Sequence, residues 1–216
     1  MPNREDGVGG LVEHSAHQPH VVAGVLGGGQ SRRLGRDKGL IQWNGRSLIE
    51  WSVVRAKRVS RQVYVLAKSR EFYSHLSCPV VSDFYSTSSP LSGILTLAPF
   101  VKEWMLLLAC DIVLFSDEVL PYVWSRRKPG KTVVVRSEEG LQPLLGFYPA
   151  AHIPYWERAY RSGNYKLQTV LEQMPRVEID AGELPTPANG TPVFLNINRE
   201  EDLERLLKIE QNMRVR

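Results

Sequence analysis

A glycine-rich segment followed by a group of cations is the part of the sequence best suited to hold a polyphosphate. Three consecutive glycines at positions 27–29 come directly after an apolar run. Glycine lets the main chain turn with no Cβ in the way of a ligand, so backbone N–H groups become available as donors. Fixed positive charge can then hold a triphosphate and stabilise the charge that moves when it reacts. The cations of this segment are Arg32, Arg33, Arg36 and Lys38.

Two commoner glycine loops do not fit this segment. A Walker A loop has four residues between its glycines and an immediate Gly-Lys-Ser/Thr, whereas Lys38 stands nine residues beyond Gly29. A dinucleotide-binding loop requires a further glycine at the position of Arg32. The alternative is a strand-to-helix loop whose arginines are only solvated, but the ordered spacing of the glycines, Arg33 and Lys38 favours nucleotide binding.

A carboxylate at the end of the clearest strand candidate is the best candidate for a metal ligand. Asp111 follows the apolar run 104–110. In an open α/β sheet, ligands bind outside the carboxyl ends of the strands, so a substrate can reach this side chain. A carboxylate there can hold Mg²⁺, which neutralises phosphate charge during transfer. The alternative, a helix cap or turn aspartate, is less favoured because Ser116 and Asp117 are better caps for the next helix.

Strand-like and helix-like segments alternate along the chain, which is typical of a largely parallel sheet covered on both faces. The sequence therefore predicts an α/β fold, a single-domain three-layer α/β/α arrangement with a mostly parallel, Rossmann-like sheet. Strands are expected over residues 21–26, 63–67, 104–110, 132–136, 144–148, 176–179 and 193–196. Helices are expected over residues 48–59, 91–101, 117–127, 153–161, 167–174 and 199–209.

The composition is that of an ordinary globular protein. Hydrophobic residues make up 43% and charged residues 23% of the 216 positions, which excludes a disordered or fibrous class. We expect a mobile N-terminal tail over 1–20, one domain over 21–210 and a C-terminal tail over 211–216. The net charge of +4 is dispersed, which favours a small polyphosphate over nucleic acid. No segment approaches the ~20 apolar residues of a membrane span, so we expect a cytoplasmic protein with no membrane partner.

The segment 26–38 resembles the signature of nucleotidyltransferases that activate phosphorylated compounds with an NTP, approximately L-x-G-G-x-S-x-R-M-G-x-D-K, with Leu34 in place of the methionine. Gly28, together with Asp37 and Lys38, is most similar to the MobA-type molybdenum cofactor guanylyltransferases of this superfamily, whose fold is GT-A-like. Further blocks that resemble this family follow in its order at residues 83, 89–94, 110–111, 142–146 and 196–198.

The resemblance implies roles for the residues of the glycine-rich segment. Lys38 would be the main phosphate-binding cation, and Arg33 would stabilise the leaving pyrophosphate. Backbone contacts to the nucleotide, including its base, would come from Leu26, Gly27 and Gly28. The resemblance also strengthens the assignment of Mg²⁺ to the carboxylate at position 111.

It further implies roles for residues later in the chain. Asp83 matches a family aspartate that helps to bind the nucleotide, although from the sequence alone it fits a turn-forming residue nearly as well. Asn196 and Asn198 match a region near the metal and the acceptor phosphate. Asn198 could equally cap the last helix, because Glu201 stands three residues later as in a capping box. Residues 142–146 would line the acceptor pocket.

The sequence also departs from the family pattern. Related enzymes commonly read Asp-x-Pro after the central strand, whereas this chain has Asp111-Ile112-Val113. Ser89 replaces the glycine that usually leads its block. The asparagine at the end of the second strand is absent, because that region holds Leu66 and Lys68. The loop after the proposed metal ligand is therefore the part of the site whose geometry is least determined by the resemblance.

The function implied by the resemblance is transfer of GMP from GTP to molybdenum-molybdopterin, with release of pyrophosphate and formation of the molybdopterin guanine dinucleotide cofactor. No Ser/His/Asp or Cys/His arrangement is evident, so direct in-line transfer with Mg²⁺ is the economical mechanism. The alternatives are a related enzyme that uses CTP on molybdopterin or an NTP on a sugar phosphate, and a non-catalytic GTP-binding protein. Molybdoenzymes or their chaperones are the protein partners that the family implies.

Overall fold

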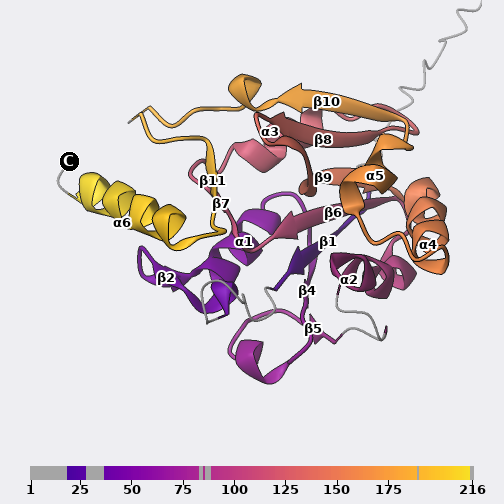
Figure 1. Ribbon diagram of the computed structural model, residues 1–216, viewed down its shortest axis with the longest axis horizontal. Helices are drawn as coiled ribbons and strands as arrows, with labels where there is room; N and C mark the ends of the chain where they lie inside the picture. Colours follow the sequence, from indigo (N-terminus) through magenta and orange to yellow (C-terminus); the bar gives the residue numbers. More distant parts are fainter. Residues whose placement is uncertain (1–18, 28–36, 83–84, 86–88, 189, 215–216) are drawn as a thin grey trace, which may run out of the picture.

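A seven-stranded, mostly parallel sheet forms the centre of the molecule (Figure 1). The computed structural model describes residues 19–27, 37–82, 85, 89–188 and 190–214. In sheet order, the strands are β10 (Arg176–Asp180), β8 (Thr132–Ser137), β9 (Gly140–Pro149), β6 (Trp104–Ala109), β1 (Val21–Leu26), β4 (Gln62–Leu66) and β5 (Val80–Val81). Strand β9 runs antiparallel to its neighbours β6 and β8, and every other neighbouring pair is parallel. The predicted α/β class is confirmed.

Helices cover both faces of this sheet, as the alternating pattern predicts. On one face α1 and α3 share an apolar cluster with Ala23 and Val25 of β1, and on the other face α2, α4 and α5 share a cluster with Val22 and Leu26. Every residue of β1 and β6 is buried, which explains why both strands are continuous apolar runs. The α-helices are α1 (Leu48–Ala56), α2 (Pro90–Leu97), α3 (Val119–Ser125), α4 (Ile153–Arg161), α5 (Leu167–Glu172) and α6 (Glu200–Arg214).

The two-stranded sheet of β7 (Ile112–Leu114) and β11 (Phe194–Asn196) lies beside the main sheet, and β7 is absent from the sequence prediction. A second small pair, β2 (Gln42–Trp43) and β3 (Arg46–Ser47), turns at Asn44 and Gly45, both with positive φ. A third apolar cluster joins β7, β11, α6 and this hairpin. Helix α6 continues through residues 211–214, which the sequence prediction placed in a C-terminal tail. The 3₁₀ segments are η1 (Lys38–Leu40), η2 (Glu71–Tyr73), η3 (Ala98–Phe100), η4 (Ala150–His152) and η5 (Ala181–Glu183).

An irregularity in β9 shapes the region where the site lies. Val134 of β8 pairs with Gly146, but the next residue, Val135, pairs with Gln142. Strand β9 therefore has three more residues than β8 at this point. A bulge re-aims the side chains of the bulged strand, and a proline is tolerated there because its missing N–H is not needed by the ladder. Pro143 is one of the three extra residues.

The close approach of β8 and β9 requires glycine at position 146. A Cβ on Gly146 would lie 2.7 Å from the carbonyl oxygen of Val133, which is backbone and cannot move aside. We expect Gly146→Ala to lower the free energy of unfolding by about 2 kcal/mol, or about 6 °C in melting temperature for a chain of this size. Calorimetry checks this. The matched control is Gly182→Ala, because Gly182 is exposed and a Cβ there would contact only a side-chain oxygen. If Gly182→Ala lowered the free energy of unfolding as much as Gly146→Ala, the steric explanation would be contradicted.

Burial of His152 should make the stability of the folded protein depend on pH. Its ring bonds Thr132 Oγ1 through Nδ1 (2.8 Å) and the carbonyl oxygen of Gly130 through Nε2 (3.1 Å). Burial lowers the pKa of His152, so the unfolded chain binds the proton more readily than the folded one. Stability that is present above the unfolded pKa of about 6.5 should therefore be lost as the pH falls below it. Melting temperatures from about pH 7.5 to 5.5 should fall less steeply in His152→Gln than in the native protein, and identical slopes would contradict this role.

Candidate active site

Three polar side chains from distant parts of the sequence meet beyond the carboxyl end of β6. Lys38 begins η1, Asp111 follows β6 after one intervening residue, and Asn198 lies between β11 and α6. The Nζ atom of Lys38 is 2.9 Å from Oδ2 of Asp111 and 3.0 Å from Oδ1 of Asn198. The side chains of Lys38 and Asp111 are 13% and 29% exposed. The structure thus joins a cation and a carboxylate that the sequence analysis assigned to phosphate and metal.

The β7–β11 pair brings the asparagine segment to Asp111. The backbone N–H of Ile197 donates to the carbonyl oxygen of Asp111 (2.9 Å), and Asn196 stands opposite Ile112. Val113, at the position where related enzymes commonly carry proline, stands opposite Leu195 in the same ladder. Residues 112–114 are therefore a strand in this chain. The geometry that the family pattern left undetermined is set by this strand pair.

The amide of Asn198 contacts Lys38, and the start of α6 is capped by another side chain. Oδ2 of Asp202 accepts from the backbone N–H groups of Asn198 and Arg199, both at 2.8 Å. The sequence analysis offered a capping box between Asn198 and Glu201, and this pairing is wrong. The helix begins at Glu200, one residue later than expected, so Asp202 takes the place of Glu201. Capping from Asp202 leaves the Asn198 side chain oxygen directed at the Lys38 ammonium.

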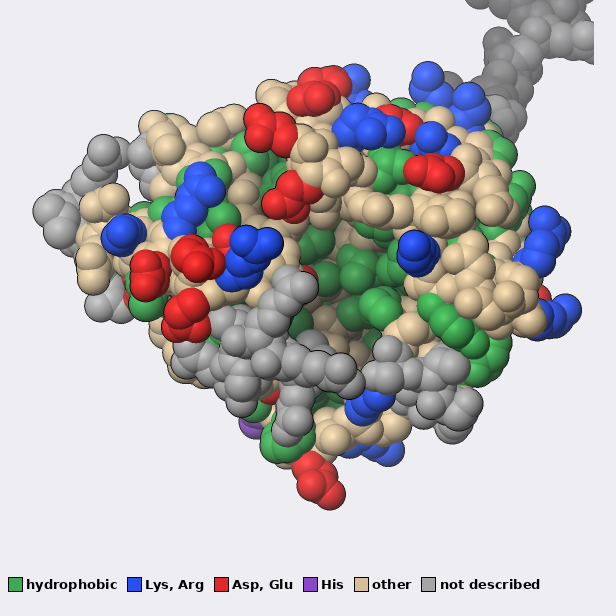
Figure 2. All heavy atoms as spheres, in the orientation of Figure 1, with side chains coloured by type: hydrophobic (Ala, Val, Ile, Leu, Met, Phe, Trp, Pro, Cys, Tyr) green, Lys and Arg blue, Asp and Glu red, His purple; other side chains and the backbone are tan. Residues whose placement is uncertain are grey.

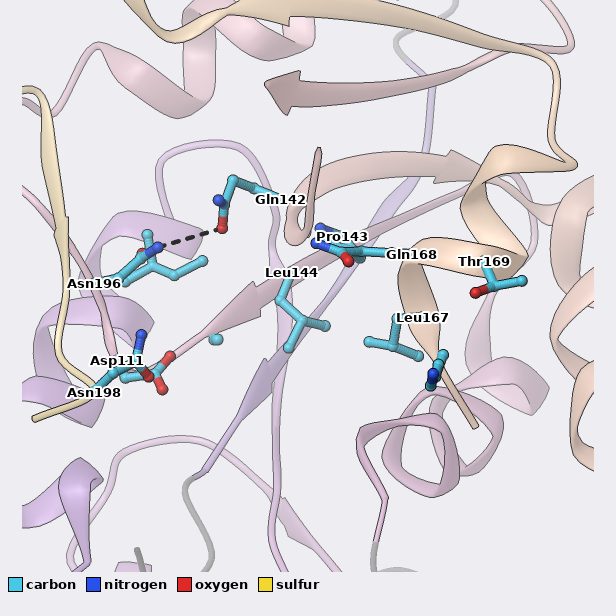
Figure 3. A pocket seen from close by; sticks show the side chains of 12 residues that line it. Asp111, Gln142, Pro143, Leu144, Leu167, Gln168, Thr169, Asn196 and Asn198 are labelled. Atoms are coloured by element: carbon cyan, nitrogen blue, oxygen red, sulfur yellow. Dashed lines mark hydrogen bonds between the residues drawn. The ribbon is translucent and has the colours of Figure 1, made fainter. Parts of the chain in front are cut away.

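A cavity of about 380 Å³ opens next to this group. Figure 2 shows a hollow on this face with hydrophobic side chains on its floor. Figure 3 shows Asp111 and Asn198 on one side of the cavity, Leu144 in the middle, and Leu167, Gln168 and Thr169 of α5 on the other side. The bulged residues Pro143 and Leu144 and the neighbouring Gln142 belong to the lining, whereas Leu145 and Gly146 of the block 142–146 are not among its lining residues. That this block contacts an acceptor stays a prediction.

The side chain of Asn196 lies at the polar edge of this cavity. Its Nδ2 donates to Oε1 of Gln142 (3.4 Å) and to Oε2 of Glu139 (3.1 Å), and the former bond is drawn in Figure 3. The Asn196 side chain is therefore directed at β9, while that of Asn198 is directed at Lys38. The two asparagines serve different sides of the site.

The sheet already uses two of the backbone groups that the sequence analysis assigned to the nucleotide. The carbonyl oxygen of Leu26 accepts from the N–H of Cys110 (3.0 Å), and the N–H of Gly27 donates to Leu66 (2.9 Å). These bonds anchor the end of β1 between its neighbours. The predicted site residues Gly28, Arg33 and Asp83 lie outside the described residues.

Sequence reasoning missed the contribution of α5 to the cavity. Lys166, Gln168 and Thr169 line it, yet no sequence motif singles them out. Only the packing of α5 against the bulged strand β9 brings them near Asp111.

In the described part of the chain, no helix is long and apolar enough to cross a membrane.

The described residues fit Mg²⁺ bound together with a substrate rather than in a protein cage. Among them there is no group of three or more His, Cys, Asp or Glu side chains that could hold a metal ion. Magnesium usually takes only one or two carboxylates, with phosphates and water completing its shell. Asp111, partly exposed at a strand end, meets that requirement.

Comparison with known proteins gives the family. A model described as MobA-like NTP transferase domain matches residues 23–177. The chain belongs to this family. The match to the MobA-like domain includes Lys38, Asp111 and the bulged part of β9, and it ends before β11, so the asparagine segment lies beyond it.

Individual relatives of this MobA-like protein extend the similarity. A probable molybdenum cofactor guanylyltransferase from Aquifex aeolicus is 34% identical, over 87% of this chain and 90% of its own. A molybdenum cofactor guanylyltransferase from Pseudomonas syringae is 33% identical, over 79% of this chain and 89% of its own. The crystal structure of molybdopterin-guanine dinucleotide biosynthesis protein A from Archaeoglobus fulgidus has a TM-score of 0.71 at 23% identity, covering 87% of this chain and 97% of its own, and this shows a shared fold.

Proposed function

We propose that this chain is a molybdenum cofactor guanylyltransferase, which transfers GMP from GTP to molybdenum-molybdopterin and releases pyrophosphate. The names of relatives that are similar over most of their length support this activity. The observation that carries the proposal is the contact of Lys38 with Asp111 and Asn198 at the edge of a cavity. A triphosphate needs the cation, its magnesium ion needs the carboxylate, and a second substrate needs the cavity.

Lys38 is suited to hold the triphosphate. Its side chain is only 13% exposed, and the attraction between charges rises as water is excluded. The bonds to Asp111 and Asn198 fix the ammonium before a nucleotide arrives, so the nucleotide need not order it. We propose that Lys38, with Arg33, stabilises the charge that accumulates on the leaving pyrophosphate.

Asp111 is the residue that would hold Mg²⁺. When bound, Mg²⁺ supplies neutralisation of phosphate charge. Lys38 engages Oδ2 of this carboxylate, and it keeps the carboxylate oriented toward the cavity edge. In the reaction, an oxygen of the acceptor phosphate forms a bond to the α-phosphorus of GTP, the bond from that phosphorus to the bridging oxygen breaks, and the electron pair leaves with pyrophosphate. The residues act by positioning and by charge, and no protein nucleophile is required.

The cavity is the proposed site of the acceptor. Leu144 and Leu167 offer apolar surface to a flat ring system. The amides of Gln142 and Gln168 are polar groups for its edge, and they are held in place by bonds from their Nε2 atoms to Ser137 Oγ (2.8 Å) and the carbonyl oxygen of Leu141 (3.2 Å). This mixture suits a pterin, and the cavity ends beside Asp111, where the phosphate of the acceptor would have to lie. We further propose that the chain works in the cytoplasm and passes its product to molybdoenzymes or their chaperones.

Pyrophosphate release from purified protein tests the function. The assay contains Mg²⁺ and molybdenum-loaded molybdopterin, with GTP, CTP, UTP or ATP in parallel. Release with GTP alone supports the proposal, whereas release with CTP would identify the sister activity on the same acceptor. Replacing the acceptor by sugar phosphates tests the sugar nucleotidyltransferase alternative. Binding of GTP without release with any acceptor would favour a non-catalytic protein.

A further inference from the structure

Tyr73, at the end of η2, is buried against the segment that carries Lys38. Tyr73 is only 1% exposed. The hydroxyl is 2.8 Å from each carboxylate oxygen of Asp37, the residue directly before Lys38. Oδ1 of Asp37 also accepts from the backbone N–H of Gly39 (2.8 Å), which closes the turn around Lys38. The hydroxyl therefore holds the side chain that fixes this turn.

Gly27 and Gly39 both lie close to the ring of Tyr73. A Cβ on Gly27 would lie 3.0 Å from Cε2 of Tyr73, and a Cβ on Gly39 would lie 2.7 Å from its hydroxyl. Tyr73 thus explains glycine at both positions through packing, in addition to the ligand approach that the sequence analysis assigned to the glycine-rich segment. The ring contacts the chain just before and just after residues 28–36, the stretch that contains Arg33.

Because the Tyr73 hydroxyl holds the Asp37 side chain, loss of this hydroxyl should disturb the turn that carries Lys38 without removing any group that touches the nucleotide. We propose that Tyr73 is a positioning residue of the nucleotide site: its hydroxyl fixes the Asp37 turn and thereby the direction of Lys38. The inference rests on the proposed function for the identity of the nucleotide, but not for the contacts that Tyr73 makes.

The electrostatic state of Tyr73 agrees with this role. Burial and the hydrogen bond to Asp37 raise the pKa of its hydroxyl, so the hydroxyl remains a protonated donor. A hydrogen bond from a neutral donor to a carboxylate is charge-assisted and is stronger than one between neutral groups. The buried ring therefore carries a protonated donor that holds the Asp37 carboxylate.

Binding measurements on Tyr73→Phe test the role, because phenylalanine keeps the ring and removes the hydroxyl. We expect GTP to bind about tenfold more weakly and guanosine to bind as before, because only the phosphate contacts depend on Lys38. The same substitution in an Asp37→Asn background should have a much smaller effect on the affinity for GTP. The matched control is Tyr148→Phe, which removes another buried hydroxyl, the donor to Pro143 (2.6 Å), and should leave GTP affinity unchanged.

Hydrogen exchange separates this inference from the proposed function, because it needs no nucleotide. We expect amide exchange of residues 37–41 to accelerate in Tyr73→Phe and to stay the same in Tyr148→Phe. Native protein that neither binds GTP nor releases pyrophosphate would overturn the proposed function, and the exchange rates would still decide what Tyr73 does. Unchanged exchange, equal loss of GTP and guanosine binding, or full additivity with Asp37→Asn would each overturn the positioning role.

Discussion

Asp111→Asn should abolish Mg²⁺-dependent release of pyrophosphate and leave the protein folded. Asparagine has nearly the same shape, and its side-chain oxygen can still accept the hydrogen bond from Lys38, which is 2.9 Å from Oδ2 in the native chain. The substitution removes the negative charge that a magnesium ion requires. We expect a loss of about 10³-fold in turnover, as for removal of a group that stabilises developing charge. Single-turnover measurements across a range of Mg²⁺ concentrations would show it.

A second strand-end carboxylate provides the matched control. Asp180 ends β10 and accepts from the N–H of Gly182 (2.8 Å), away from the Lys38 group. Asp180→Asn should keep full activity. A melting temperature close to that of the native protein would show that Asp111→Asn is folded. Undiminished turnover of Asp111→Asn would remove Asp111 from the mechanism, and recovery at high Mg²⁺ would indicate that it contributes to binding the ion rather than to the step itself.

The parts of the fold that the sequence predicts are those with a long, local signal. Strands β1 and β6 are six-residue apolar runs in which every residue is buried, so the local sequence predicts both as buried strands. The same logic makes Asp111 a candidate metal ligand, because ligands bind beyond the carboxyl ends of such strands. Lys38 is a candidate phosphate-binding residue because of its spacing after the glycines, which is also a local property of the chain, and because of the family resemblance.

The parts that were missed depend on contacts between distant segments. Strand β7 has three residues, too few for an alternation to be recognised, and it exists because β11 pairs with it across about 80 residues of sequence. The choice between capping and contact for Asn198 depended on where α6 begins, and a shift of one residue transfers the capping role from Glu201 to Asp202. The bulge at Pro143 likewise follows from the register with β8, which no local pattern reports.

Lys38→Ala should weaken the binding of GTP far more than the binding of guanosine. The ammonium is the described cation that lies against Asp111, and phosphate oxygens are the groups of the nucleotide that it can contact. Loss of a hydrogen bond between charged groups corresponds to about 1.5–3 kcal/mol, or about 10- to 100-fold in affinity. Titration calorimetry with both ligands measures the difference. The control Lys102→Ala removes an exposed cation before β6, at the opposite end of the strand, and should change neither affinity.

The same variant also separates the two roles of the ion pair. Without Lys38, Asp111 loses the partner that engages Oδ2, so its carboxylate becomes more available to a cation. Binding of Mg²⁺ in the absence of nucleotide should therefore stay the same or tighten in Lys38→Ala, while binding of GTP weakens. If Mg²⁺ and GTP binding both weaken, Lys38 serves mainly to orient Asp111. Equal losses for GTP and guanosine would show that the ammonium supports the site as a whole and makes no phosphate contact of its own.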